Sequence, residues 1–447
     1  MESSKTLMAG VLGGIALGTA YALSPLGVWF VAAAAGIFMW AGRGLGESER
    51  RWIFGILAAA IALRVLAIAL LFALQPHDVA VSFFWDGDGV YLKQRAIWIS
   101  NVWSGVPIAP VDFANAFSRE YGWTTYLYVL AYLQYLTGPM PYAVHLLNAA
   151  IFVATAVALY RLARPVYGPH AAMLGLFVLL FLPSPFLWSV SALKESLYVF
   201  IAVLALVGLV TAWRAGSVAK RAAAFAIMLM ALAVIGSVRA GGLVIVGGGL
   251  LLGLLANIVT RRAWLTVTVV VLVLGGATYA LRRADVQARV VSRLTQSAVL
   301  HLGNVRTAGH SYRLLDGLSY FSPAEGFTMS PPEAARFVVR AVASLLAVPL
   351  PWQIDTPSEK LFLPQQVLWY LLVAFACVGL VAGLRRDPLV TCLLAAFAVT
   401  GGLVIALNSG NIGTMVRHRD TIVPFVVWLS ALGATSTLSK LAARNEV

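Results

Sequence analysis

Four polar clusters interrupt an otherwise apolar chain, and the first carries two carboxylates. It reads Phe84-Trp85-Asp86-Gly87-Asp88-Gly89-Val90-Tyr91. Carboxylates two residues apart, with glycines between them, can converge on one substrate hydroxyl and act as a general base. They can also hold a divalent cation such as Mg²⁺ or Mn²⁺. Asp-Gly pairs form ordinary tight turns as well, so all three interpretations stay open.

Two further clusters combine charged residues with small ones. Lys194-Glu195 stands at the expected start of a helix, where adjacent residues do not share one face. The pair is therefore either a functional site or an interfacial lysine beside a helix-start glutamate. Arg239 precedes Ala240-Gly241-Gly242. Small neighbours allow a phosphate oxygen to approach the guanidinium closely, and an interface anchor is the alternative.

The fourth cluster is strongly basic and precedes the last apolar run. It contains Arg417-His418-Arg419, followed by Asp420. Guanidinium groups bind phosphate through paired hydrogen bonds, so this cluster predicts a phosphate or diphosphate site, unless the arginines form ion bridges such as Arg419 with Asp420. Three further residues are candidates for substrate binding: Tyr91 at the end of the first cluster, Lys93 just after it, and Arg313.

The elements that position these clusters follow from the composition. The chain has 447 residues, of which 60% are hydrophobic and 11% charged, with a mean hydropathy of +0.86. Soluble domains contain about 25% charged residues, so the composition excludes a soluble enzyme, a disordered protein and a disulfide scaffold. Cys377 and Cys392 lie in apolar runs and indicate neither a disulfide nor a metal site. We predict an all-α polytopic membrane protein.

About twelve apolar runs approach the ~20 residues that cross a bilayer. The first ends in Ala20-Tyr21-Ala22, which resembles a signal-peptidase site, but we expect it to persist as a helix because a second run follows at once. Arg64 lies within the third run, as a functional group or paired within the bundle. The predicted spans are 7–23, 25–41, 52–74, 142–163, 170–187, 192–213, 221–238, 241–260, 263–281, 365–384, 388–407 and 421–438.

The basic residues assign a side to each loop. One side carries 15 basic and 5 acidic residues together with both termini, so the positive-inside rule makes it cytoplasmic. Most of the net charge of +14 is therefore topology and requires no nucleic acid. We interpret residues 121–137 as a helix on the outer surface, because counting them as a span would invert every later loop. Residues 337–350 and the arginines at 282, 283, 289 and 293 predict further surface helices.

This topology divides the chain into five segments. Residues 1–74 hold three spans, 75–141 form a first outer loop with the acidic motif, and 142–281 hold six spans. Residues 282–364 form a long second outer loop, and 365–447 hold three more spans. Loops of this length are usually functional, and all four clusters lie on the outer side.

The order of features over residues 75–215 resembles the GT-C membrane glycosyltransferases, which include protein O-mannosyltransferases and the aminoarabinose transferase of lipid A. The resemblance implies catalytic carboxylates at Asp86 or Asp88 and at Glu195, although Lys194 departs from the usual pattern. It is carried by Asp86, Asp88 and Tyr91; Gly105–Pro107; Gly138-Pro139; His145-Leu-Leu-Asn148; Tyr160–Arg164; Tyr167-Gly168; and Pro183-Ser-Pro185.

The resemblance also implies the reaction. A sugar moves from a polyprenyl-phosphate donor to a hydroxyl of a glycan, lipid or protein at the outer face of a bacterial inner membrane. A carboxylate removes the hydroxyl proton with inversion at the anomeric carbon, and cations at Arg239, Arg417, His418 and Arg419 stabilise the departing phosphate. Two rivals remain: an oligosaccharide polymerase or O-antigen ligase that uses a lipid diphosphate, and a transporter or flippase for a lipid-linked sugar.

Overall fold

The computed structural model is built from α-helices, with two short 3₁₀ turns and one isolated bridge between Ser311 and Asn411 in the part of the chain that it describes. The all-α prediction is confirmed. The structure describes residues 11, 13–15, 18–19, 21–22, 24–75, 88–118, 125–138, 140–306, 311–320, 326–353, 360 and 363–445.

Ten of the described helices are long and apolar enough to cross a membrane. The chain is therefore an integral membrane protein. The ten helices are α2 (Pro25–Gly42), α3 (Glu47–Leu74), α8 (Ala143–Tyr167), α11 (Glu195–Arg214), α12 (Val218–Val238), α13 (Gly242–Thr260), α14 (Ala263–Arg282), α18 (Leu363–Arg386), α19 (Pro388–Asn408) and α21 (Val423–Asn445).

Each of these helices coincides with a predicted span. An eleventh predicted span, 170–187, is a broken pair, because α9 (Pro169–Phe181) ends before Pro183 and α10 (Pro183–Ser189) follows it. Proline lacks an amide hydrogen and its ring clashes with the preceding turn, which explains the break. The first predicted span, 7–23, lies largely outside the described residues.

The chain forms two compact units. Unit 1 contains residues 1–161, 185–203 and 234–240, and unit 2 contains residues 162–184, 204–233 and 241–447. The segments of the two units alternate along the sequence. The units therefore differ from the five topological segments predicted above.

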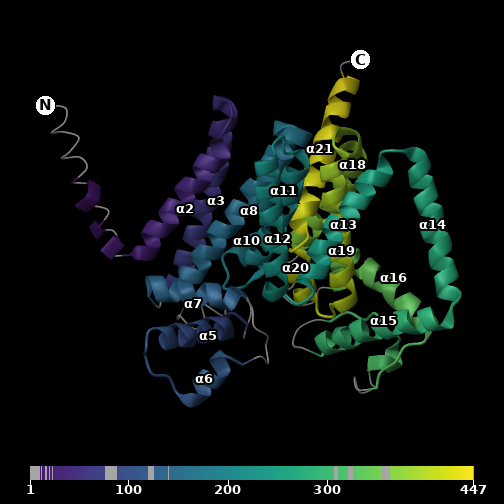
Figure 1. Ribbon diagram of the computed structural model, residues 1–447, viewed down its shortest axis with the longest axis horizontal. Helices are drawn as coiled ribbons and strands as arrows, with labels where there is room; N and C mark the ends of the chain where they lie inside the picture. Colours follow the sequence, from purple (N-terminus) through teal and green to yellow (C-terminus); the bar gives the residue numbers. More distant parts are fainter. Residues whose placement is uncertain are drawn as a thin grey trace. The chain divides into compact units, whose positions relative to one another are not determined.

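In unit 1, three short helices lie at one end of α2, α3 and α8 (Figure 1). They are α5 (Asp88–Trp103), α6 (Pro110–Ala116) and α7 (Thr125–Thr137). At 13 residues α7 is too short to span a bilayer, as expected for the surface helix predicted over 121–137. Its Tyr132 ring packs on Trp103 of α5 with ring centroids 4.6 Å apart.

In unit 2, α15 (Ala284–Val305) and α16 (Pro331–Ala347) lie at the same end of α18, α19 and α21 as the short helix α20 (Ile412–Arg419) (Figure 1). The amphipathic helix α16 buries Phe337, Ala341 and Leu345, which agrees with the surface helix predicted at 337–350. One detail of the prediction is wrong: the four arginines do not share one helix. Arg282 ends α14 and Arg283 caps α15, which leaves Arg289 and Arg293 on α15.

Contacts within each unit join helix ends that the topology assigns to the same side. Tyr160 donates to Glu49 Oε1 at 2.6 Å in unit 1. In unit 2, Arg386 Nη1 donates to the Tyr167 carbonyl at 2.8 Å, and Arg214 forms an ion pair with Asp387. All of these residues lie on the predicted cytoplasmic side.

Helices α18 and α21 meet backbone to backbone. A Cβ atom at Gly379 would overlap the carbonyl oxygen of Leu429, and one at Gly433 would overlap that of Phe375. Such reciprocal glycine contacts allow close helix packing inside membranes, where dispersion forces replace the hydrophobic effect. The two glycines therefore fix the crossing point of α18 and α21.

We predict that Gly379→Ala destabilises the protein by about 1–3 kcal/mol, the usual cost of overpacking a tight contact. Thermal unfolding in detergent measures this as a lower midpoint temperature. Gly275→Ala on α14 is the control, because a Cβ there meets nothing within 4 Å. Equal midpoints for the two variants would contradict the crossing described above.

Candidate functional site

The site in unit 1 is built around the turn that joins α10 to α11. Its successive backbone carbonyls accept hydrogen bonds from buried side chains of α7 and α8. Tyr126 Oη donates to the Ala192 carbonyl at 3.0 Å. Asn148 Nδ2 lies 2.8 Å from the Ser191 carbonyl and 2.7 Å from that of Leu193.

Two more side chains complete this arrangement. His145 Nδ1 lies 2.7 Å from the carbonyl of Val190, and because a carbonyl can only accept, Nδ1 carries the proton. Arg64 Nε donates to Ser189 Oγ at 2.8 Å. Arg64, Tyr126, His145 and Asn148, hereafter the clamp, therefore hold residues 189–193 in one conformation.

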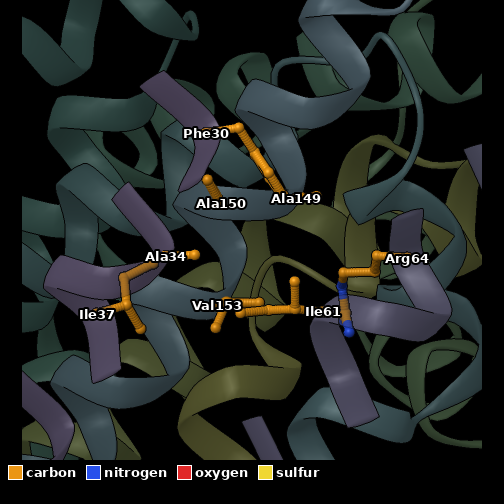
Figure 2. A pocket seen from close by; sticks show the side chains of 8 residues that line it. All are labelled: Phe30, Ala34, Ile37, Ile61, Arg64, Ala149, Ala150 and Val153. Carbon is orange, nitrogen blue, oxygen red and sulfur yellow. The ribbon is translucent and has the colours of Figure 1, made fainter. Parts of the chain in front are cut away.

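Arg64 performs this task from inside the bundle. Its side chain is fully buried, and Nη1 also donates to the Ala60 carbonyl at 3.1 Å. The guanidinium carbon lies 4.8 Å from the centroid of the Phe186 ring. Figure 2 shows it as the one charged side chain among the labelled residues of a pocket lined by α2, α3 and α8. Of the two interpretations of Arg64, these contacts favour pairing within the bundle.

The clamp places Glu195 at the first position of α11, where the side chain is 5% exposed. The helix N-terminus favours a negative charge at this position. Burial raises the pKa of Tyr126, and the nearby charge of Glu195 raises it further. Tyr126 therefore stays a neutral hydrogen-bond donor beside the Glu195 carboxylate.

Arg239 reaches the same end of α11. Its guanidinium carbon lies 5.6 Å from the centroid of the Tyr198 ring. Tyr198 and Glu195 are three residues apart and share one face of the helix. Thr125 and Ser237 form a short hydrogen bond that joins the start of α7 to the end of α12. Arg239, Glu195 and the clamp therefore belong to one region of unit 1.

The lysines predicted as ligands also lie in unit 1. Lys93 of α5 is half-buried, burial lowers the pKa of its ammonium, and its charge acts on His145 of the clamp. Lys194 is the residue directly before Glu195 and is half-buried. The Tyr91 ring lies under the guanidinium of Arg95, 5.3 Å from centroid to carbon, and Arg95 donates in turn to the Ser118 carbonyl at 2.8 Å. Tyr91 is thus held by its own helix.

The acidic pair is only partly described. Asp86 lies outside the described residues, and Asp88 begins α5 while its side chain is not described. Among the described residues, no group of three or more His, Cys, Asp and Glu side chains could hold a metal ion. A divalent cation at Asp86 and Asp88 therefore remains a prediction.

The basic cluster predicted at residues 417–419 lies in unit 2, and its third member faces inward. Arg419 is 1% exposed. Its Nη2 donates to Gln366 Oε1 at 2.8 Å and its Nη1 to the Val348 carbonyl at 3.2 Å. Burial lowers the pKa of Arg419 to about 10, so it stays charged at neutral pH. These contacts hold the Arg419 guanidinium inside the protein, and phosphate binding by Arg419 stays a prediction.

This cation helps to fasten the end of α16. The last carbonyls of a helix lack partners within it, and here α18 supplies them. Trp369 Nε1 donates to the Leu346 carbonyl at 3.2 Å, and Tyr370 Oη donates to that of Ala347 at 2.7 Å. Arg417 is also buried, whereas His418 is half-buried. Phosphate binding by Arg417 and His418 stays a prediction.

Arg313 lies in the long second outer loop, and this loop pairs with the residues just before α20. Tyr312 N donates to the Gly410 carbonyl at 3.1 Å, next to the Ser311–Asn411 bridge. The exposed Arg313 lies over the Tyr320 ring, 5.3 Å from centroid to guanidinium carbon. The structure thus brings Arg313 and the basic helix α20 into one unit.

A buried histidine fixes this loop, and its tautomer follows from the hydrogen bonds. Tyr320 Oη accepts from the amides of Leu314 at 2.7 Å and Leu315 at 3.0 Å. Its own hydrogen must then point to His301 Nε2, 3.0 Å away. His301 Nδ1 therefore carries the ring proton and donates to the Ser409 carbonyl at 2.7 Å. Burial lowers the pKa of His301, which agrees with a neutral ring.

Sequence reasoning missed the clamp as a unit and missed His301 entirely. Asn148 and His145 stand three residues apart in an apolar run, and polar residues within spans are a general signal of buried contacts. Tyr126 lies among several aromatic residues of α7 and gives no separate signal. His301 appears as a lone histidine in a basic surface helix, where nothing indicates a buried partner.

No family model, no curated protein and no solved structure matches this chain. The site is therefore interpreted from its own chemistry.

We predict that Asn148→Leu lowers the free energy of unfolding by about 1–3 kcal/mol, because it leaves two buried carbonyls without donors. Asn115→Leu, at an exposed position of α6, is the matched control. Thermal unfolding in detergent compares the two. A midpoint for Asn148→Leu equal to that of the control would show that the clamp contributes nothing to stability.

The neutral His301 predicts a pH dependence of stability. Its pKa is lower in the folded than in the unfolded chain, where histidine titrates near pH ~6.5. The unfolded state then binds more protons as the pH falls through this region, so stability is lost below about pH 6.5. His301→Gln, which cannot titrate, should flatten the decline of the unfolding midpoint between pH 7.5 and 5.5.

His170→Gln is the control for this measurement, because His170 is exposed. It should keep the decline of the wild-type protein. If the unfolding midpoint of His301→Gln declined with pH as steeply as that of the wild type, protonation of His301 would not be the source of the pH dependence.

Proposed function

We propose that this protein is a membrane glycosyltransferase that moves a sugar from a polyprenyl-phosphate donor to a hydroxyl acceptor. The acceptor is a glycan, lipid or protein at the outer face of a bacterial inner membrane, and both termini are cytoplasmic. The single observation that carries the proposal is a buried carboxylate, Glu195, held by the clamp at the same end of unit 1 as Arg239 and Lys93.

A carboxylate and cations near each other suit this chemistry. The acceptor oxygen attacks the anomeric carbon, and the bond from that carbon to the phosphate oxygen breaks. The hydroxyl proton passes to a carboxylate, and the electron pair of the broken bond stays with polyprenyl phosphate. A general base assists the attack by removing the hydroxyl proton. Preorganised cations stabilise the charge that develops on the phosphate.

The residues divide between these tasks. Asp86 or Asp88 serves as the base in the first outer loop, in line with the GT-C resemblance, and Glu195 is the second catalytic carboxylate. Arg239, Lys93 and Lys194 supply positive charge in unit 1. The low exposure of Glu195 suits a group that orients the acceptor hydroxyl or the sugar. Tyr91, on α5, is a candidate substrate-binding residue.

One observation favours a second candidate, a polymerase or ligase that uses a lipid diphosphate. The pairing of residues 311–312 with 410–411 brings Arg313 and the basic helix α20 together in unit 2. Such an enzyme would rely on arginines for its lipid diphosphate and would not need the acidic pair. The two candidates therefore differ in which charges are essential.

Carboxamide substitutions separate the two. In proteoliposomes supplied with a panel of radiolabelled polyprenyl-phosphate hexoses and pentoses and a bacterial membrane acceptor fraction, we predict that Asp86→Asn or Asp88→Asn lowers kcat about 10²–10⁴-fold, the usual worth of a general base. Glu195→Gln should also lose activity. Asp112→Asn, in α6 of the same loop, is the control and should retain it.

A different pattern would contradict the proposal. If the three carboxamide variants keep full transfer activity and Arg417→Ala or Arg313→Ala abolishes it, the arginine-based polymerase or ligase is the better account.

A further inference from the structure

A hollow lined partly by basic side chains lies between α18 and α21, at the helix ends that the topology assigns to the cytoplasmic side. It encloses about 1150 Å³ of space, counted to its open side. Pockets of this size hold ligands rather than single waters. We call it the basic hollow. Its lining includes Val378, Arg385 and Arg386 of α18 and Ser436, Ser439 and Lys440 of α21.

The charges of the basic hollow have one sign. The described residues that line it include Arg385, Arg386 and Lys440 and no acidic side chain. Asp387, the next residue along the chain, forms its ion pair with Arg214. Arg385 and Lys440 are exposed and form no ion pair with any described residue. The positive-inside rule accounts for basic residues on this side, but it does not require them to share one hollow. An anionic occupant is therefore electrostatically favoured.

One hydroxyl group in the lining lacks a partner. Ser436 Oγ is buried and makes no hydrogen bond with any described residue. The hydroxyl of the preceding residue differs, because Thr435 Oγ1 donates to the Ala431 carbonyl at 2.9 Å. Ser436 lies one turn before Lys440 and shares its helix face. Buried hydroxyl groups normally have a hydrogen-bond partner, and an anionic oxygen in the basic hollow would supply the acceptor that Ser436 lacks.

The lining continues from basic side chains onto apolar ones. Val378, Val381 and Ala382 belong to it, together with Cys377. The spacing of these residues places the first three on the face of α18 that carries Arg385. From Arg385 to Cys377, the rise of about 1.5 Å per residue gives about 12 Å along the helix. The hydrocarbon of one leaflet is about 15 Å thick, half of the bilayer core. The basic hollow therefore matches a ligand with a charged group and a hydrocarbon chain that lies within one leaflet.

We propose that the basic hollow binds one anionic phospholipid of the cytoplasmic leaflet. The phosphodiester group lies at Arg385 and Lys440 and accepts a hydrogen bond from Ser436, and one acyl chain extends along α18 toward Cys377. Basic pockets between transmembrane helices on the cytoplasmic side bind the headgroups of such lipids. Because the charges come from both helices, the lipid bridges α18 and α21. The site is independent of the proposed transfer reaction, which takes place at the opposite side of the membrane.

Direct binding to the full-length protein tests this site. Phosphatidylglycerol is titrated onto delipidated protein in detergent, and bound lipid is counted by native mass spectrometry. The double variant Arg385→Gln/Lys440→Gln should weaken binding at least 10-fold, because it removes two positive charges from the basic hollow. Lys220→Gln/Arg262→Gln removes two exposed charges of the same predicted side, outside the lining, and should bind like the wild type. Equal affinities of the two double variants would overturn the proposal.

The unpartnered hydroxyl tests the position of the headgroup. Ser436→Ala should weaken the binding of phosphatidylglycerol several-fold, because the phosphate loses a hydrogen-bond donor. Thr435→Ala is the matched control and should bind like the wild type, because this hydroxyl already donates to a carbonyl of its own helix. Wild-type affinity in Ser436→Ala would place the headgroup outside the basic hollow and refute the site.

Two other ligands decide what the basic hollow recognises. Phosphatidylethanolamine has the same acyl chains without net charge and should bind at least 10-fold more weakly; equal binding would make the hollow an ordinary lipid-facing surface. Glycerol 1-phosphate has the charge without the chains and should not displace phosphatidylglycerol at the same concentration. Displacement would make the hollow a site for soluble phosphate esters and would contradict the lipid assignment. None of these measurements requires sugar transfer, so the lipid site and the transferase activity are tested separately.

Discussion

A backbone turn near the hydrocarbon region of a membrane must have its carbonyls satisfied by protein, because lipid offers no hydrogen bonds. The turn between α10 and α11 meets this constraint through the clamp, whose four side chains reach residues 189–193 from α3, α7 and α8. The surface helix α7 is thereby anchored to the spans. The first residue after the turned segment, Lys194, and the buried Glu195 acquire fixed positions as a consequence. A site built in this way is preorganised, which is the property that electrostatic catalysis requires.

The same constraint operates in unit 2 with other residues. The carbonyls at the end of α16 receive donors from Trp369, Tyr370 and Arg419, and these hydrogen bonds attach α16 to α18 and α20. A histidine held in one tautomer ties α15 to the end of α19. In both units, polar side chains that look isolated in the sequence fasten amphipathic helices to apolar ones. The proposed chemistry depends on the positions of charged side chains, and these hydrogen bonds fix those positions.

The apolar runs predicted the ten long apolar helices of the described residues, because burial in lipid demands some twenty apolar residues regardless of packing partners. The charge asymmetry of the loops led to the prediction that residues 121–137 form a surface helix, and α7 within this range has 13 residues. Tertiary contacts could not be predicted in the same way. The inward hydrogen bonds of Arg419 were not predicted, because its partners, Gln366 and the Val348 carbonyl, come from distant parts of the chain. The clamp could not be predicted for the same reason, since most of its hydrogen bonds to residues 189–193 go to backbone carbonyls, which no residue type indicates.

The central claim is that a carboxylate of this protein activates an acceptor hydroxyl for direct displacement of polyprenyl phosphate. The anomeric configuration of the transferred sugar tests it most directly, by nuclear magnetic resonance of the product against that of the donor. A single displacement predicts that every product molecule has the configuration opposite to that of the donor. Retention of configuration would contradict the account, because a single in-line displacement inverts the anomeric carbon.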